Sequence, residues 1–138
     1  MSPDVFTFEI PGPIRGKGRP RFVRATGRTY TPADTMNAEA WVKHCAVQAG
    51  AKPTCLPVRL WVTIAVAVPE SWPRKKRDQA LANAMKPTGK PDLDNIAKLI
   101  GDSLNGICWQ DDKQIFEMTV QRHYAHVART VVTVDPWQ

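Results

Sequence analysis

The sequence predicts a single domain of the α/β (α+β) class, in which a mixed β-sheet packs with helices in the order β-α-β-α-α-β-β. The chain has 138 residues, 43% of them hydrophobic, which is enough for one domain with its own core. Apolar residues recur at every second position in some segments and at helical spacing in others. Residues 58–68 are largely apolar on both faces in their second half, as expected of a central strand.

The first half of the chain contains a strand, a basic loop and a helix. Residues 4–10 alternate apolar and polar side chains, which predicts a strand that ends at Pro11. Thr31 suits the cap of a helix, Pro32 its first position and Gly50 its end. The apolar stripe of this helix, which we expect to pack in the core, is Ala38, Trp41, Val42, Cys45, Ala46 and Ala49.

The second half adds a strand, two helices and two further strands. The β-branched run over residues 58–68 is the predicted central strand. Residues 74–85 predict a short helix with a basic first turn. Positive charges are unfavourable at this end of the helix dipole, and either a nearby phosphate or simple solvation would compensate for them. Residues 94–104 carry the period of another helix. Residues 114–124 and 127–134 predict two strands joined by a short turn as a C-terminal hairpin.

Composition and charge exclude several classes of protein. The chain holds 19 basic and 13 acidic side chains, and its net charge of +6 suits a polyanionic partner. No apolar run reaches the ~20 residues that span a bilayer, and residues 1–6 lack the layout of a signal peptide, so we expect a cytoplasmic protein. Cys45, Cys55 and Cys108 are odd in number and widely spaced, which favours free thiols over disulfides or a zinc site.

Within the single domain, residues 1–138, a basic loop covers residues 11–30. Its glycines and prolines prevent a helix and let the backbone approach a ligand closely. Phe22 and Tyr30 are available for stacking, so we interpret the loop as an arm that grips DNA phosphates. A solvated hairpin loop without a function is the alternative. The candidate DNA-binding residues are Lys17, Arg19, Arg21 and Arg24 of the loop, and Arg74, Lys75 and Lys76 of the later helix.

An acidic segment covers residues 90–113 and gathers carboxylates that are scarce elsewhere. Five of the 13 acidic residues lie there, namely Asp92, Asp94, Asp102, Asp111 and Asp112. Pro91 favours an extended chain, in which Asp92 and Asp94 point to the same side. Carboxylate oxygens are the hard ligands that Mg²⁺ and Mn²⁺ prefer. The segment therefore predicts a metal site.

Each acidic feature also has an ordinary structural explanation. An aspartate at a helix start often caps the helix. Asp94 and Lys98 are spaced as an i,i+4 ion pair on the polar face of the predicted helix. Asp111-Asp112 suits a solvated turn. Only their joint occurrence in a basic chain favours the metal site over these alternatives.

Three stretches of the acidic segment resemble the signature of a known family. They read Lys90-Pro-Asp-Leu-Asp-Asn-Ile-Ala-Lys, Asp102-Ser-Leu-Asn-Gly and Asp111-Asp112-Lys-Gln-Ile. They are similar to the signature of the RusA family, Holliday-junction resolvases common in bacterial prophages, and Lys-x-Arg-Pro-Arg at residues 17–21 resembles that family too. The resemblance implies catalytic, metal-binding carboxylates at Asp92, Asp94 and Asp112, a catalytic lysine at Lys98, and supporting roles for Asp111 and Asn95.

By this resemblance the chain is an endodeoxyribonuclease that uses Mg²⁺, with Mn²⁺ as a substitute and no further small-molecule cofactor. Its substrate would be four-way junction DNA, which a homodimer cuts by paired symmetric nicks in recombination and repair. The residues agree with this chemistry, because three carboxylates can hold one or two ions and Lys98 can stabilise charge that develops on the phosphate. Taken alone, the residues indicate a metal-dependent nuclease acting on DNA.

Two other functional classes stay open from the sequence. A flap or single-strand nuclease would use the same carboxylates, and a catalytically silent DNA-binding module would need only the basic surface. If the chain forms a homodimer, the candidates for its interface are apolar residues of the last two strands and the C-terminus, Ile115, Val120, Val131 and Trp137.

Overall fold

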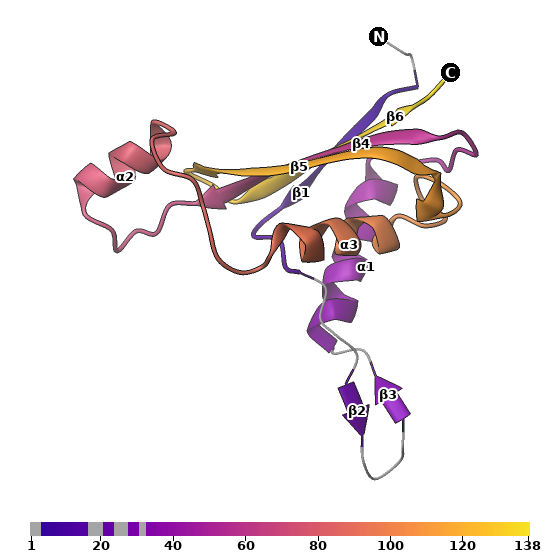
Figure 1. Cartoon of the computed structure of the whole chain (residues 1–138), viewed down its shortest axis with the longest axis horizontal. Coiled ribbons are helices and arrows are strands. Elements are labelled where there is room, and N and C mark those ends of the chain that lie inside the picture. The colour runs from indigo at the N-terminus through magenta and orange to yellow at the C-terminus, as the bar shows by residue number, and fades with distance from the viewer. Residues whose placement is uncertain (1–3, 17–20, 24–27, 31–32) are drawn as a thin grey trace.

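The computed structural model describes residues 4–16, 21–23, 28–30 and 33–138. The main sheet consists of β1 (Phe6–Pro11), β4 (Val58–Ala67), β5 (Ile115–Ala125) and β6 (Arg129–Pro136). The helices are α1 (Ala33–Gln48), α2 (Arg74–Leu81) and α3 (Leu93–Ser103), followed by the 3-10 turn η1 (Asp112–Gln114). The mixed sheet, packed with α1 and α3 on one face, confirms the predicted class and order of elements (Figure 1). A separate two-stranded hairpin, β2 (Arg21–Val23) with β3 (Arg28–Tyr30), lies in the basic loop.

The strand order of the sheet, β1-β6-β4-β5, makes β4 a central strand, as its apolar character predicted. It pairs in parallel with β5 and antiparallel with β6. The predicted C-terminal hairpin is therefore wrong, because β5 and β6 are consecutive in the chain but lie on opposite edges of β4. A buried strand needs hydrogen-bond partners on both edges, and β4 obtains them by lying between β5 and β6.

The core lies between the sheet and one face each of α1 and α3. From α1, Val42 and Ala46 are buried, and from α3, Ile96, Leu99 and Ile100 are buried. Each large apolar side chain buried in this way contributes about 1.5–3 kcal/mol of hydrophobic stabilisation. The burial fixes α3 against the sheet and leaves its opposite face toward solvent.

Trp41 departs from the predicted stripe of α1. Ala38 and Cys45 pack against the core as expected, but Trp41 is 45% exposed. Its Nε1 donates a hydrogen bond to the carbonyl oxygen of Pro11 at 3.1 Å, and its ring stacks on His44. The indole therefore covers the chain that leaves β1 and does not enter the core, because the polar N–H finds its partner at the surface.

Helix α2 lies beyond one end of the sheet and is shorter than predicted (Figure 1). It ends at Leu81, and Asn83 adopts a left-handed conformation with φ of 65° that cannot continue a helix. Trp72 meets Tyr124 of β5 edge to face, with 5.5 Å between ring centroids, and Lys76 Nζ lies 3.9 Å from the centre of the Trp72 ring. These contacts attach the basic helix to the end of β5. Over the described ranges, none of the helices has the length and apolar character to cross a bilayer.

Candidate active site

Helix α3 presents the start of the acidic segment to solvent. Asp92 is the residue before the helix and has extended backbone angles, φ −64° and ψ 150°. The helix begins at Leu93, so Asp94 already belongs to its first turn and the side-to-side alternation of an extended chain does not apply to the pair. Asp92, Asp94 and Lys98 are exposed, because the apolar residues of α3 fill the face that meets the sheet.

Neither ordinary explanation for these first carboxylates holds. Asp92 occupies the N-cap position, but its side chain makes no capping hydrogen bond. Among the ion pairs between described residues, none joins Asp94 to Lys98. The helix start therefore places two carboxylates and one ammonium group in solvent without using them as a cap or as a pair.

The Asp111–Asp112 turn has a local structural role that falls mainly on Asp111. The Asp111 carboxylate accepts a hydrogen bond from the backbone N–H of Lys113 at 2.9 Å, and the Gln114 side chain returns to the Asp111 N–H as in a capping box. This backbone hydrogen bond, a further one with Asp112 and the charge of Lys113 lower the pKa of Asp111. Asp111 is thus a turn-capping residue.

Asp112 is in the opposite electrostatic situation. Burial raises its pKa, and the hydrogen bond with Asp111 and the negative charges of Asp102 and Asp111 raise it further. A raised pKa means that the ionised carboxylate is disfavoured where it lies. Asp102 and Asp111 thus place negative charge beside the partly desolvated carboxyl of Asp112.

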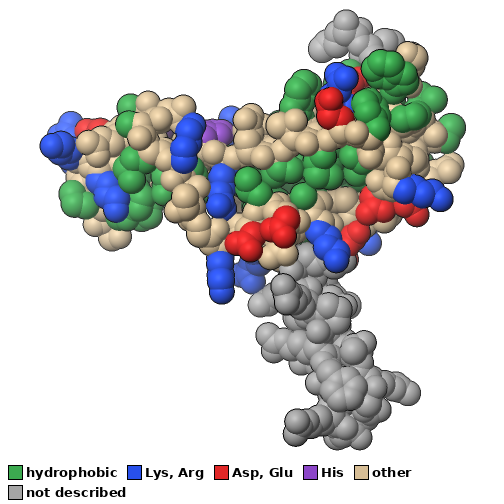
Figure 2. All heavy atoms as spheres, in the orientation of Figure 1, with side chains coloured by type: hydrophobic (Ala, Val, Ile, Leu, Met, Phe, Trp, Pro, Cys, Tyr) green, Lys and Arg blue, Asp and Glu red, His purple; other side chains and the backbone are tan. Residues whose placement is uncertain are grey.

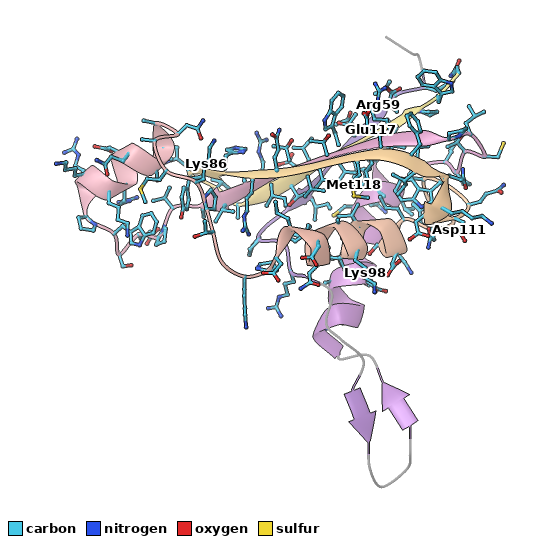
Figure 3. The ribbon with its side chains drawn as sticks, viewed as in Figure 1. Arg59, Lys86, Lys98, Asp111, Glu117 and Met118 are labelled. Atoms are coloured by element: carbon cyan, nitrogen blue, oxygen red, sulfur yellow. The ribbon has the colours of Figure 1, made fainter. Side chains whose placement is uncertain are left out.

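The side chain of Asp112 packs directly on α3. A Cβ atom at Gly101 would lie 3.7 Å from Asp112 Oδ2 and 3.8 Å from its Cβ, so the small residue lets the turn approach the helix. An open groove of about 450 Å³ runs between α3 and the start of β5 at this point. Its lining residues are Ala97, Lys98, Gly101, Asp112, Ile115, Phe116, Glu117 and Met118. Figure 3 shows Lys98 and Asp111 on the same edge of the molecule, with Met118 between β5 and α3.

The structure brings Lys98 and Asp112 to one groove but does not gather all three predicted metal ligands. Asp94 and Gly101 are seven residues apart on one face of α3, which is about 10 Å along the helix axis. Lys98 lies between them on that face. In the part of the chain that the structure describes, no group of three or more His, Cys, Asp or Glu side chains is arranged to hold a metal ion. Asp92 and Asp94 thus stand at one end of the site and Asp112 at the other.

Basic side chains lie close to this acidic face. Figure 2 shows Lys and Arg side chains over α2 and on both sides of the acidic groups. Arg74, Lys75 and Lys76 are exposed on the first turn of α2, as predicted, and Arg74 also pairs with Asp78 at 3.9 Å. The side chains of the other four candidate DNA contacts are not among those that the structure describes: Lys17, Arg19, Arg21 and Arg24.

Comparison with protein families gives a match to the family Endodeoxyribonuclease RusA over residues 11–135, which include the whole of the basic loop and of the acidic segment. The chain belongs to the RusA family. A protein of Bacillus subtilis (strain 168) that carries the description "Uncharacterized protein YqaN" is 28% identical over 138 residues, covering 95% of this chain and 96% of that protein. The family resemblance of the acidic segment is thus confirmed, and the chain is an endodeoxyribonuclease by family.

Three residues of this RusA-family chain contact the site although no role was predicted for them. Gln114 is hydrogen-bonded to the Asp111 turn, and its place three residues after a helix-capping aspartate is a signal that could have revealed it. Arg122 of β5 donates to backbone carbonyls just before Asp92. Gly16 packs on α3, since a Cβ atom there would lie 2.8 Å from Pro91 Cβ and 3.1 Å from Asn95 Cβ. No local pattern reveals Arg122 or Gly16, because their partners are distant in sequence.

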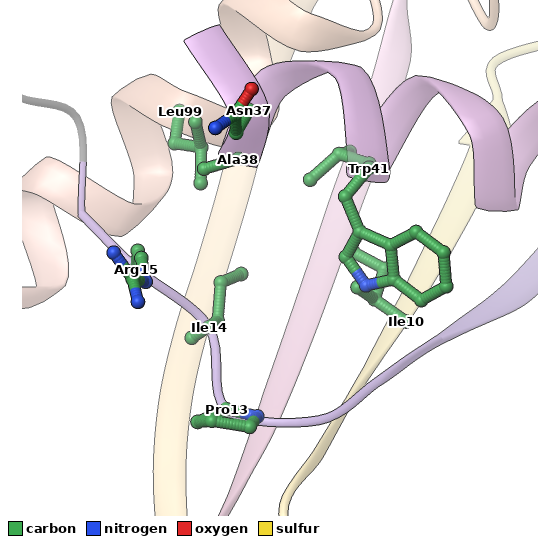
Figure 4. A pocket seen from close by; sticks show the side chains of 9 residues that line it. Ile10, Pro13, Ile14, Arg15, Asn37, Ala38, Trp41 and Leu99 are labelled. Carbon is green, nitrogen blue, oxygen red and sulfur yellow. The ribbon is translucent and has the colours of Figure 1, made fainter. Parts of the chain in front are cut away.

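A second hollow in the RusA-family domain lies on the other side of α3 (Figure 4). It measures about 300 Å³ and lies between the chain after β1, helix α1 and Leu99. Its lining residues are Ile10, Pro13, Ile14, Arg15, Asn37, Ala38, Trp41, Val42 and Leu99. No carboxylate is among them, whereas Asp112 and Glu117 line the groove beside Lys98.

Proposed function

We propose that this RusA-family chain is a divalent-metal-dependent endonuclease that resolves four-way DNA junctions by paired symmetric nicks, in the cytoplasm and in the service of recombination and repair. The observation that carries the proposal is the groove beside α3 that Lys98 and Asp112 line together, with Asp94 exposed in the first turn of the same helix, in a chain whose family cuts DNA. Neither the exposed pair at the helix start nor the repelled Asp112 serves the stability of the fold in an evident way.

The donor set suits a hard divalent cation. Carboxylate oxygens are preferred ligands of Mg²⁺ and Mn²⁺, and the pKa of Asp112 is raised first by burial and then by the neighbouring carboxylates, whose negative charge a cation would offset. In this proposal Asp92 and Asp94 supply metal ligands at one end of the site and Asp112 supplies one at the other, because about 10 Å along α3 is too far for a single ion to contact all three. When bound, the ion would supply charge stabilisation at the phosphate and a more acidic water.

The residues of the chain have separate tasks in the cleavage. Lys98 brings an ammonium group to the groove beside Asp112, where it would stabilise the negative charge that builds on the scissile phosphate. Asp111 and Asn95 act through structure, Asp111 by capping the turn and Asn95 by packing against Gly16. The exposed Arg74, Lys75 and Lys76 would hold flanking phosphates by contacts that carry no sequence information.

The proposal includes a homodimer, because two opposed nicks require two sites and a two-fold dimer matches the symmetry of a four-way junction. The predicted interface changes in detail. Ile115 and Val120 are partly buried and pack against the core, so they offer less surface to a partner. Trp61, Phe116 and Trp137 are 46%, 49% and 59% exposed, and Phe116 and Trp137 meet edge to face at 5.7 Å between centroids. These aromatic side chains, Trp137 among the original candidates, are the better interface.

The test is cleavage of a labelled synthetic four-way junction, beside a linear duplex and a flap of the same sequence, with Mg²⁺, Mn²⁺ or EDTA. We expect paired nicks in opposed strands of the junction with either ion and none with EDTA. The variant Asp112→Asn should bind the junction without cutting it, because it keeps the shape of the turn and loses the charge. Equal cleavage of duplex or flap would indicate a different nuclease, and tight binding without any cleavage would indicate a DNA-binding module.

A further inference from the structure

The side chain of Gln114 connects the Asp111–Asp112 turn to a distant part of the chain. Its Oε1 accepts hydrogen bonds from the backbone N–H groups of Gln110 at 2.8 Å and Asp111 at 2.9 Å. Its Nε2 donates to the carbonyl oxygens of Thr54 and Leu56, both at 2.9 Å. The amide oxygen thus accepts two hydrogen bonds and the amide nitrogen donates two. Because the backbone N–H groups can only donate and the carbonyl oxygens can only accept, the oxygen and nitrogen of the amide cannot be exchanged.

These four bonds fix the turn that carries Asp112. The segment around Thr54 and Leu56 precedes β4, and it is anchored in turn by the hydrogen bond from Thr54 N–H to the carbonyl of the buried Cys108. Gln114 therefore ties the turn to the framework at the start of the central strand. A side chain of the same size without the amide would leave two N–H and two C=O groups without these partners.

Arg122 performs a matching task near the other end of β5. Its Nη1 donates to the carbonyl oxygen of Pro91 at 2.9 Å and to that of Gly89 at 3.2 Å. Pro91 directly precedes Asp92, and Arg122 is opposite the buried Ile64 in the register of β4 and β5. The guanidinium therefore braces the segment that leads to Asp92 and Asp94 from the framework of the sheet.

We propose that Gln114 and Arg122 are positioning residues of the active site, which hold the Asp112 turn and the Asp92–Asp94 segment at opposite ends of strand β5. Neither needs to touch DNA or metal. Arg122 donates hydrogen bonds to backbone carbonyls just before Asp92, and Gln114 donates to those of the segment before β4 while its oxygen holds the turn of Asp112. The rigid strand β5 between them then sets the distance between the two groups of carboxylates. The inference deepens the proposed nuclease function and rests on it for its consequences in catalysis.

The experiment compares Gln114→Met with Gln121→Met, and Arg122→Ala with Arg129→Ala. Gln121 and Arg129 are exposed residues on β5 and β6. Among the described residues, the side chain of Arg129 pairs only with Glu9. Each control therefore makes the same chemical change at a position away from the site. The measurements are the single-turnover cleavage rate at saturating junction, the dissociation constant of the junction, and amide hydrogen exchange.

We expect Gln114→Met and Arg122→Ala to lower the cleavage rate by about 10- to 100-fold with junction affinity within about twofold, because misplacement of reacting groups by ~1 Å has effects of this order. The amides of Gln110 and Asp111 should exchange faster in Gln114→Met, and those of residues 92–96 in Arg122→Ala. The two controls should behave as the unaltered protein. Milder variants guard against unfolding: Gln114→Glu keeps the acceptor oxygen, Arg122→Lys keeps a single donor, and both should show intermediate rates.

Two results would overturn the proposal. One is that Gln114→Met and Arg122→Ala have the same cleavage rates and the same amide exchange rates as their control variants. The other is a loss of junction affinity in parallel with rate, which would make the residues direct DNA contacts. If the unaltered protein binds but does not cut the junction, the proposed function fails, whereas the exchange measurements still decide whether Gln114 and Arg122 hold the acidic segments.

Discussion

The contact between the basic loop and α3 can be tested with two glycines that border the site. At Gly16 a Cβ atom would lie 2.8 Å from Pro91 Cβ, so Gly16→Ala must move one segment by about 0.6 Å to reach the 3.4 Å of ordinary contact. At Gly101 the nearest atom would lie 3.7 Å away, so Gly101→Ala needs no movement. The same added methyl group is therefore expected to have opposite effects at two positions beside one helix.

The magnitudes follow from packing and helix propensity. Gly16→Ala should destabilise by about 1–3 kcal/mol, as overpacking does. Gly101→Ala should stabilise by about 0.5–1 kcal/mol, because glycine inside a helix is less favourable than alanine. At about 4 °C per kcal/mol for a domain of this size, Tm should fall by about 4–12 °C in the first variant and rise by about 2–4 °C in the second.

Thermal unfolding and junction cleavage are the assays for this pair. Because Pro91 and Asn95 flank Asp92 and Asp94, Gly16→Ala should also lower the cleavage rate by about tenfold, whereas Gly101→Ala should keep it. Unchanged Tm and rate in Gly16→Ala would show that the loop does not pack on α3. A loss of stability in Gly101→Ala would show that the Asp112 turn lies closer to the helix than 3.7 Å.

Four further predictions concern single side chains of the site. Asp92→Asn and Asp94→Asn should each abolish cleavage and leave junction binding intact or tighter, and near-normal turnover in a gel assay would remove that residue from the site. Lys98→Ala should reduce the saturated rate with little change in Kd, because its partner is charge in the transition state; a parallel loss of affinity would make it a backbone contact. Lys75→Ala should weaken binding and reduce the slope of log K against log salt by about one, whereas an unchanged slope would exclude a phosphate contact. The folded-state pKa of Asp112 is raised, first by burial, so ionisation of this carboxyl costs stability above that pKa and nothing below the ordinary value. Asp112→Asn should therefore raise Tm at about pH 7 and not at about pH 3, and an equal rise at both would show that the pKa of Asp112 is not raised.

Local patterns in the sequence predicted the strands of the main sheet, the three helices and the acidic segment. The stripe of α3, with buried Ile96, Leu99 and Ile100, follows from helical spacing and fixes which side faces water. The apolar run of β4 predicted its central place in the same way. The exposure of Asp94 and Lys98 follows from the phase of the same helix, and the family resemblance rests on the short-range spacing of Asp92, Asp94 and Lys98.

Only the tertiary structure decided which segments meet. The placement of β5 and β6 on opposite edges of β4 overrode the expected hairpin, because strand pairing depends on partners far apart in sequence. The packing of Asp112 against Gly101, which separates it from Asp92 and Asp94, depends on how the turn before β5 docks on α3. Gln114 and Arg122 escaped notice for the same reason: each bonds to backbone carbonyls more than 30 residues away, and a carbonyl carries no sequence signal. Sequence therefore determined which chemical groups are present and which face of each element they occupy, while the distances between them were decided by long-range packing.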